Sequence, residues 1–192
     1  QDYKLHELSL PDVELLLPPP PRGATPFLLA ADRADVALIR LLLELGADPF
    51  IPNLDHTTPL MAAAGLGTAA PEEEAGTEPE ALIATRLLLD LGADINAVND
   101  ACDTAMHGAA YGSFPTVVQL LADHGADINI WNQKNEQGRT PLFIAEGHRG
   151  GLPRLSRATI EAITVLMDGA GVSTDGERPE IVDQNAPKPA EP

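Results

Sequence analysis

The hydrophobic residues of this chain recur in short leucine- and alanine-rich blocks that small or polar residues separate. In residues 38–45, LIRLLLEL, leucines stand at i, i+3, i+4 and i+7, the spacing of one face of a helix. Gly46 follows this block, where glycine commonly ends a helix. Another kind of block begins at Thr25 and Pro26, a pair that suits the N-cap and the first position of a helix. The pattern therefore predicts pairs of short helices in close contact through alanines.

Both kinds of block recur at a fixed spacing. LLLELGADP, LLLDLGADI and LLADHGADI are versions of the first block, and TPFLLAA, TPLMAAA, TAMHGAA and TPLFIAE are versions of the second. The glycines are Gly46, Gly92 and Gly125, and the threonines are Thr25, Thr58, Thr104 and Thr140. Thr25 and Thr58 are 33 residues apart, as are Gly92 and Gly125. The chain is therefore a tandem repeat. Polar segments such as residues 94–104, between a glycine and the next threonine, are expected to form hairpin-like fingers.

The repeat unit resembles a known family. TPLMAAA and TAMHGAA, followed by LLLDLGADI and LLADHGADI at a period of 33 residues, are similar to the ankyrin repeat, and the resemblance covers about residues 23–173. TPLMAAAGLG and DTAMHGAAYG look most like the ankyrin-repeat proteins of soil bacteria. The resemblance implies an all-α ankyrin-repeat solenoid of helix-turn-helix units with β-hairpin-like fingers, four repeats and an N-terminal half-repeat cap. Inner helices and fingers would line a concave face, and neighbouring repeats would share one core.

The repeats divide the chain into three parts. Residues 1–21 are expected to form the half-repeat cap and a proline-rich connector, and residues 175–192 a disordered acidic and proline-rich tail. Between them lies the ankyrin-repeat domain, residues 22–174, with repeats at about 22–52, 53–98, 99–131 and 132–174.

The regular repeat is interrupted at several places. An acidic insertion at about residues 68–80 is either a solvated loop or a contact for a basic partner. Residues 147–157 hold a second insertion with three arginines, which we interpret as a polar loop of the last repeat. His56 and Cys102 replace the glycine favoured at the turn of a finger. Either residue would be mildly strained at a positive φ, which favours a different type of turn in these two fingers.

Composition and charge narrow the range of functions. The net charge is −17 and only 4% of the residues are aromatic, so small aliphatic side chains are expected to build the core. So acidic a chain repels phosphate backbones and anionic lipids, which argues against nucleic-acid and membrane-surface binding. No apolar run approaches the roughly 20 residues that a membrane helix needs. Gln1 in place of Met favours a removed leader and an extracytoplasmic or periplasmic location, or a trimmed longer chain, with a cytoplasmic location as the alternative.

The sequence contains no arrangement typical of an enzyme. Phosphate-binding, hydrolase and zinc motifs are absent, no cofactor or metal is implied, and Cys102 stands alone, so no disulfide can form within the chain. His107 lies at the TPLH position, where the resemblance implies a structural imidazole that links neighbouring fingers by hydrogen bonds. We therefore expect no catalytic residues.

A partner-binding surface is expected on the fingers and at the exposed ends of the inner helices, where the resemblance places the variable positions. On the fingers these positions are Phe50, Pro52, Val98, Asp100, Trp131, Lys134 and Arg139. On the inner helices they are Asp32, Arg33, Leu66, Tyr111 and His148. Aromatic and apolar side chains among few charges are typical of the centre of a protein interface. The sequence favours a protein-binding module, with a structural scaffold subunit or a fragment of a larger multidomain protein or assembly as the alternative.

Trp131 is the single tryptophan, and it lies in the polar stretch ADINIWNQKNEQGRTP. Thr104 and Thr140 are 36 residues apart, so this finger is three residues longer than a regular one. In the first interpretation, Trp131 occupies the tip position of the other fingers, and its indole faces outward to anchor the partner. In the second, the longer finger folds back and covers the indole against Ile128 or Ile130.

Overall fold

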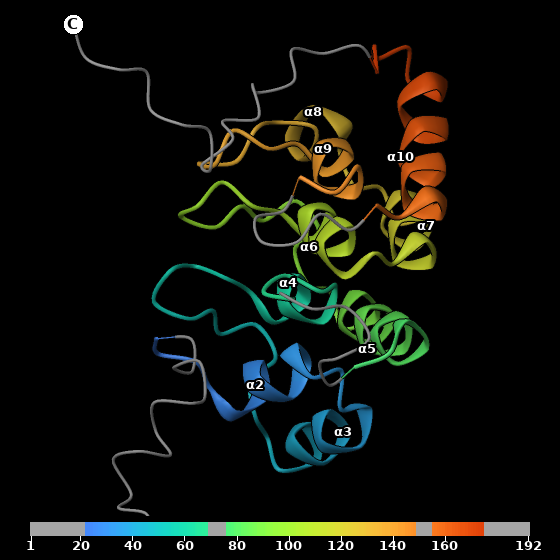
Figure 1. The fold of residues 1–192 in the computed structure, drawn as a ribbon. Helices are drawn as coiled ribbons and strands as arrows, with labels where there is room; N and C mark the ends of the chain where they lie inside the picture. The colour runs from blue at the N-terminus through green and yellow to red at the C-terminus, as the bar shows by residue number, and fades with distance from the viewer. Residues whose placement is uncertain (1–21, 69–75, 149–154, 175–192) are drawn as a thin grey trace, which may run out of the picture.

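The computed structural model describes residues 22–68, 76–148 and 155–174. Within these ranges all regular structure is helical, and no strand is present (Figure 1). The helices are α2 (Pro26–Asp32), α3 (Val36–Glu44), α4 (Pro59–Ala63), α5 (Glu78–Asp90), α6 (Ala105–Gly112), α7 (Pro115–Asp123), α8 (Ile128–Trp131), α9 (Pro141–Ala145) and α10 (Arg157–Gly169). The all-α prediction is therefore confirmed. The expected half-repeat cap at residues 1–21 and the tail at residues 175–192 lie outside the described residues.

The helices are stacked in two rows (Figure 1). The inner helices α2, α4, α6 and α9 contact one another in that order, as do the outer helices α3, α5, α7 and α10. Each inner helix also packs against the outer helix that follows it, in the pairs α2 and α3, α4 and α5, α6 and α7, and α9 and α10. The arrangement is that of an ankyrin-repeat solenoid, in which each helix pair covers the apolar faces of its neighbours.

The loops that precede the inner helices project from the stack on the side opposite the outer helices (Figure 1). We name them fingers. The described residues include the end of the first finger at residues 22–25, the second finger at residues 47–58, the third at residues 93–104 and the fourth at residues 126–140. The short helix α8 belongs to the fourth finger.

Local hydrogen bonds begin and end the helices where the sequence predicts. The Oγ1 of Thr25 accepts a bond from the backbone N–H of Leu28 at 3.1 Å, and the threonines before α4 and α9 make the equivalent bond. At the end of α5, Gly92 has a φ of 93°, and the glycines that follow α3 and α7 have similar angles. Glycine adopts this left-handed conformation without a steric penalty. The local signals therefore set the helix boundaries.

Alanine and glycine allow the inner helices to approach one another closely. Fully buried alanines lie in or at the end of each inner helix, namely Ala31, Ala64, Ala109, Ala110 and Ala145. A Cβ atom on Gly108 of α6 would lie 2.8 Å from the backbone nitrogen of Leu66 and 2.9 Å from the carbonyl oxygen of Met61. Because these are backbone atoms, they cannot move aside as the end of a side chain can. Only glycine therefore fits where α6 crosses the end of α4.

The two insertions are described in part. Residues 69–75 and 149–154 lie outside the described residues. The last residues of the acidic insertion do not form a loop, because Glu78 and Glu80 belong to the first turn of α5. Glu80 accepts a hydrogen bond from the backbone N–H of Thr77 at 2.9 Å, which lowers the pKa of its carboxyl group. Part of the insertion therefore extends an outer helix, which corrects the expectation of a loop up to residue 80.

Each complete finger reverses direction in a tight turn. The backbone N–H of Asn53, Asn99 and Asn135 donates to the carbonyl group four residues further on, at 2.9–3.0 Å. His56 has a φ of 56° and Cys102 a φ of 61°, so both keep the positive angle that Gly138 has in the fourth finger, and the expected change of turn type does not occur. A residue with a Cβ atom is mildly strained in this conformation.

Candidate functional site

A buried asparagine holds the turn of the second, third and fourth fingers. The Oδ1 of Asn53 accepts hydrogen bonds from the backbone N–H groups of Asp55 and Thr57, at 3.0 and 2.8 Å. Asn99 and Asn135 bond to the N–H groups of their own turns in the same way. Because a buried amide oxygen is costly to leave unpaired, these bonds fix the shape of each turn. These asparagines were not among the residues predicted from the sequence.

Side-chain hydrogen bonds join the third finger to the second and the fourth finger to the third. The Nδ2 of Asn99 donates to the Oγ1 of Thr57 at 3.0 Å. The Nδ2 of Asn135 donates to the Oδ1 of Asp103 at 2.8 Å. One asparagine therefore both shapes its own finger and fixes that finger against its neighbour.

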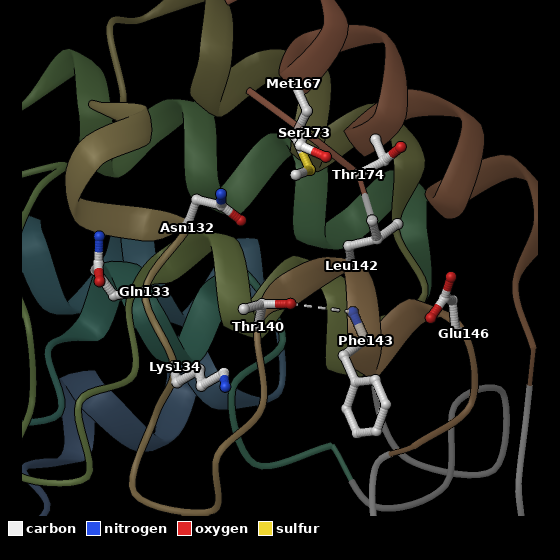
Figure 2. Close-up of a pocket in the computed structure, with 10 residues that line it drawn as sticks. All are labelled: Asn132, Gln133, Lys134, Thr140, Leu142, Phe143, Glu146, Met167, Ser173 and Thr174. Atoms are coloured by element: carbon white, nitrogen blue, oxygen red, sulfur yellow. Dashed lines mark hydrogen bonds between the residues drawn. The ribbon is translucent and has the colours of Figure 1, made fainter. Parts of the chain in front are cut away.

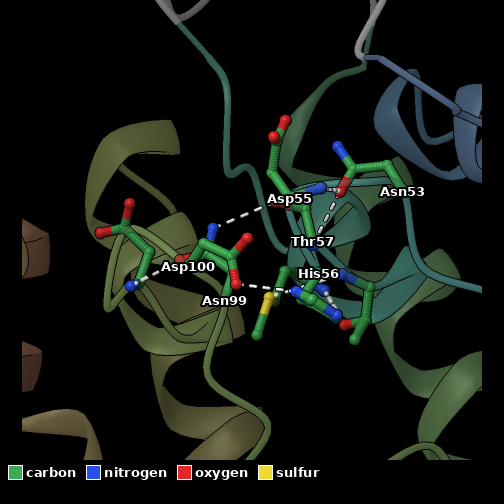
Figure 3. Close-up of polar contacts among 9 residues, drawn as sticks. Asn53, Asp55, His56, Thr57, Asn99 and Asp100 are labelled. Atoms are coloured by element: carbon green, nitrogen blue, oxygen red, sulfur yellow. Dashed lines mark hydrogen bonds and ion pairs between the residues drawn. The ribbon is translucent and has the colours of Figure 1, made fainter.

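Backbone hydrogen bonds repeat the same connection. The N–H of Asp100 in the third finger donates to the carbonyl oxygen of Asp55 in the second, at 3.1 Å (Figure 3). The equivalent bonds run from Leu54 to Arg22 at 3.0 Å and from Glu136 to Ala101 at 2.9 Å. The described fingers thus form one continuous hydrogen-bonded row, which fixes the positions of their turns relative to one another.

His107 links the start of α6 to the fourth finger. Its Nδ1 lies 3.2 Å from the backbone nitrogen of Thr104, and its Nε2 lies 3.2 Å from the carbonyl oxygen of Gln133. The N–H of Thr104 donates to Nδ1, so the ring proton is on Nε2 and bonds to Gln133. Burial lowers the pKa of His107 to about 4, so the imidazole is neutral at neutral pH. The predicted structural role of His107 is confirmed.

Asp103 lies inside the row of fingers. Burial raises the pKa of its carboxyl group, whereas the hydrogen bond from Asn135 and the charge of Arg139 act in the opposite direction. The hydroxyl group of Tyr111 lies 3.3 Å from the same Asn135 amide. Asp103 is therefore part of a buried polar network that holds two fingers together.

The predicted contact residues lie in three environments. Phe50, Val98, Asp32, Arg33, Asp100 and Lys134 are exposed. Pro52, Leu66, Tyr111, Arg139 and His148 are half-buried, and Trp131 is buried. Leu66 and Tyr111 pack against the core, so they offer only part of their side chains to a partner. The exposed members lie mainly on the second and third fingers and at the end of α2.

Trp131 does not face outward, so the first interpretation of its position is wrong. Its side chain is 3% exposed at the end of α8, the helical turn formed within the lengthened finger. Asp127 caps this turn by accepting a hydrogen bond from the backbone N–H of Asn129 at 2.8 Å. Trp131 belongs to the buried core, against which Ile128 also packs. The indole is therefore buried, as the second interpretation expects.

The register of the fourth finger explains why Trp131 was wrongly expected to face outward. Asn135 makes the turn bonds that asparagine makes in the two preceding fingers. Lys134, and not Trp131, therefore corresponds to Val98. In all three fingers the asparagine lies five residues before the threonine that opens the next inner helix, here Thr140. Counting back from that threonine would have found the register.

An exposed apolar residue at the tip of the second finger was missed. Leu54 is 64% exposed and directly follows Asn53. It lies beside the first finger, because a Cβ atom on Gly23 would meet the Cγ of Leu54 at 2.6 Å. Asp100 occupies the same position in the third finger and was predicted as a contact residue. Aligning the two fingers would therefore have identified Leu54. Ile51 of the second finger is also exposed and was also missed.

A surface contact joins the tips of the second and third fingers. The Nδ1 of His56 lies 2.7 Å from the Oδ1 of Asp100 (Figure 3). Both side chains are mostly exposed, and such pairs contribute little to stability, about 1 kcal/mol at most. The contact therefore leaves Asp100 accessible at the finger tip.

A pocket of about 400 Å³ opens between the fourth finger, α9 and the end of α10 (Figure 2). Lys134 and Glu146 are its two charged lining residues, and Phe143 and Met167 contribute apolar surface. Among the residues that the structure describes, no group of three or more His, Cys, Asp or Glu side chains could hold a metal ion. No described helix is long and apolar enough to cross a membrane.

Two family models, both of ankyrin repeats, match parts of the chain. Residues 78–170 match the family "Ankyrin repeats (3 copies)", and residues 22–54 match the family "Ankyrin repeat". The two matches together cover more than half of the chain. The chain therefore belongs to the ankyrin-repeat proteins. Ankyrin repeats are generally protein–protein interaction modules.

Several curated proteins are similar in sequence. Ankyrin repeat and KH domain-containing protein mask-1 of Caenorhabditis elegans is 26% identical, over 85% of this chain and 7% of its own length. Ankyrin repeat and SOCS box protein 16 of Homo sapiens is 30% identical, over 78% of this chain and 30% of its own length. Neurogenic locus notch homolog protein 1 of Mus musculus is 34% identical, over 64% of this chain and 4% of its own length. The chain thus spans less than a third of each relative. All three are animal proteins. The predicted likeness to the ankyrin-repeat proteins of soil bacteria is therefore not tested by them.

Proposed function

We propose that this chain is a non-enzymatic module that binds a protein partner through its fingers and the exposed ends of its inner helices. The observation that carries the proposal is the exposure of Leu54 and Val98, 64% and 46%, on two neighbouring fingers. Single exposed aliphatic residues are common on protein surfaces. Here they lie on adjacent loops joined by hydrogen bonds, as expected of a surface that a partner covers.

The rigidity of the fingers supports this proposal. Loops are usually mobile, and ordering them on binding costs free energy. In this chain the buried Asn99 side chain and the bond from Asp100 to Asp55 already hold the second and third fingers in place. A partner would therefore meet a surface that needs little further ordering.

The remaining predicted contact residues differ in how far their side chains are exposed. Phe50 of the second finger is exposed, and Arg33 and Asp32 at the end of α2 are also exposed. We include these residues in the proposed surface. Trp131 is left out, because its buried indole cannot reach a partner without unfolding α8.

A comparison of two matched variants tests the proposed surface. Leu54→Ser with Val98→Ser removes apolar side chains from the fingers, whereas Leu45→Ser removes a leucine that is 73% exposed after the outer helix α3. Wild type and both variants are immobilised, and proteins captured from native cell extract are quantified by mass spectrometry. We expect a partner that is retained by wild type and Leu45→Ser but reduced about tenfold or more by the finger variant. Equal capture by all three chains, with circular dichroism showing intact folds, would refute the proposed surface.

A further inference from the structure

Lysine and arginine are nearly absent from the middle of the chain. Between Arg40 and Lys134 the sequence contains one such residue, Arg86, which is exposed on the outer helix α5. The second and third fingers therefore carry no lysine or arginine. Positive charge returns at both ends of the row of fingers, where the exposed residues Arg22 and Lys134 lie on the first and fourth fingers.

Two exposed carboxylates lie on neighbouring positions of this central region. The backbone N–H of Asp100 donates to the carbonyl oxygen of Asp55, so the two aspartates belong to directly bonded parts of adjacent fingers (Figure 3). Both residues are exposed, and the contact of Asp100 with His56 is itself at the surface. Two negative charges on adjacent fingers attract a cation more strongly than either does alone.

An exposed apolar side chain accompanies each carboxylate. Leu54 directly precedes Asp55, and Val98 lies two residues before Asp100. Burial of exposed apolar area in an interface is favourable. The region thus combines two apolar contacts with two negative charges, and no lysine or arginine lies on either finger to neutralise them.

We propose that the second and third fingers bind a protein segment in which apolar side chains are flanked by lysine or arginine. This inference rests on the proposed function and names the chemistry of the partner at the same surface. Apolar side chains of the segment cover Leu54 and Val98, and its cations lie against Asp55 and Asp100. The apolar contacts supply most of the affinity, while the charges orient the segment and disfavour acidic competitors.

The charges at both ends of the row limit where such a segment binds. Arg22 and Lys134 repel a basic segment that extends beyond the second and third fingers. The net charge of −17 attracts cations to the whole molecule, so the test must separate the two fingers from the general field. At about 0.15 M salt, attraction between exposed charges is largely screened beyond roughly 8 Å, which favours the local contribution.

Peptide selection tests the proposal without a known partner. A random peptide library displayed on phage is selected on the full chain at about 0.15 M salt, and enriched peptides are synthesised with a fluorescent label. Fluorescence anisotropy then gives their dissociation constants for wild type, Asp55→Asn with Asp100→Asn, and Leu54→Ser with Val98→Ser. We expect the peptides to combine lysine or arginine with apolar residues. Each double substitution should weaken binding about tenfold or more.

Matched variants on the outer helices serve as controls. Glu44→Gln with Asp90→Asn removes the same charge from exposed positions at the ends of α3 and α5. Leu45→Ser removes an exposed leucine from the same side of the molecule. These controls are expected to change the dissociation constants by about twofold at most, since distant exposed charges are screened. Thermal unfolding of each variant verifies that the fold is retained.

Each other outcome overturns a defined part of the argument. Enriched peptides that are acidic or uncharged, but that lose affinity with Leu54→Ser and Val98→Ser, refute the basic partner and leave the proposed function standing. No enriched peptide, or peptides insensitive to every finger substitution, contradicts both proposals. Equal losses of peptide affinity in the finger and outer-helix charge variants would show that the net negative charge of the whole molecule attracts the peptides. That result overturns the inference.

Discussion

The Nδ2 of Asn135 donates a hydrogen bond to the Oδ1 of Asp103 at 2.8 Å, which joins the fourth finger to the third. The same side chain accepts, through Oδ1, from the backbone N–H groups of Gln137 and Arg139. One buried amide thus sets the shape of its finger and the position of that finger in the stack. The geometry of the finger surface therefore depends on residues that a partner does not touch.

Asn135→Ala is expected to lower the free energy of unfolding by about 2–3 kcal/mol, because it leaves the partners of one amide unpaired. Urea unfolding followed by circular dichroism measures the change. Asn132→Ala in the same finger is the matched control, and we expect it to cost less than about 1 kcal/mol. An equal loss at Asn132 would show that our register of the fourth finger is wrong.

His107→Met is expected to remove part of the pH dependence of stability. The pKa of His107 is about 4 in the folded chain and near 6.5 when unfolded, so the folded state binds fewer protons between these values. The stability associated with the neutral imidazole is full above about pH 6.5 and is lost as the pH falls towards about 4. Methionine occupies the equivalent position in α4 as Met61, and it does not titrate.

The measurement is the free energy of unfolding at about pH 7 and about pH 5, the range in which His107 should matter. Wild type is expected to lose more stability over this range than His107→Met. If both lose the same amount, the buried imidazole does not control the acid sensitivity. The signals of His107 in an NMR titration provide an independent check of its pKa.

Thr85→Val is expected to stabilise the chain. The Oγ1 of Thr85 is buried in α5 and makes no hydrogen bond to any residue that the structure describes. Valine has nearly the same shape and removes the cost of the unpaired hydroxyl group, so the free energy of unfolding should rise by about 1 kcal/mol. Thr159→Val in α10 is the control, because the Oγ1 of Thr159 lies 2.8 Å from the Oγ of Ser156. Loss of this hydrogen bond should lower the free energy of unfolding. Thermal unfolding distinguishes the two variants, and a destabilised Thr85→Val would contradict the argument.

Gly108→Ala is expected to destabilise the chain by about 1–3 kcal/mol, because its Cβ atom would push the backbone of α4 away from α6. Gly169→Ala at the end of α10 is the matched control. No described atom lies within 4 Å of the Cβ position at Gly169, and alanine is the better helix former. The control should therefore be neutral or stabilising in urea unfolding. Equal effects of both substitutions would mean that the close approach at Gly108 does not limit the packing.

The helix boundaries could be predicted because their signals are local. A threonine such as Thr25 bonds to an N–H group only three residues away, and Gly92 needs only its own backbone freedom. These interactions do not depend on the rest of the fold. The positive φ angles of His56 and Cys102 could not be predicted in this way, because the hydrogen bonds of the whole turn hold these residues there.

The finger surface could be predicted only in part. The position of Trp131 depends on the fold of three inserted residues and on the side chains that cover it, and neither follows from the spacing of the helices. Leu54 was missed because its exposure depends on the turn that Asn53 holds. Val98 and Asp100, which keep the regular spacing, lie on the exposed surface as expected.

The constant spacing of five residues between the finger asparagine and the next threonine has a consequence for engineering. Length changes in this chain occur outside that interval, in the helical turn Ile128–Trp131 and between paired helices. The stack therefore tolerates grafted loops at one set of positions and resists them at another. A foreign segment inserted ahead of the asparagine would be displayed on the surface while the bonding pattern beneath it stays the same.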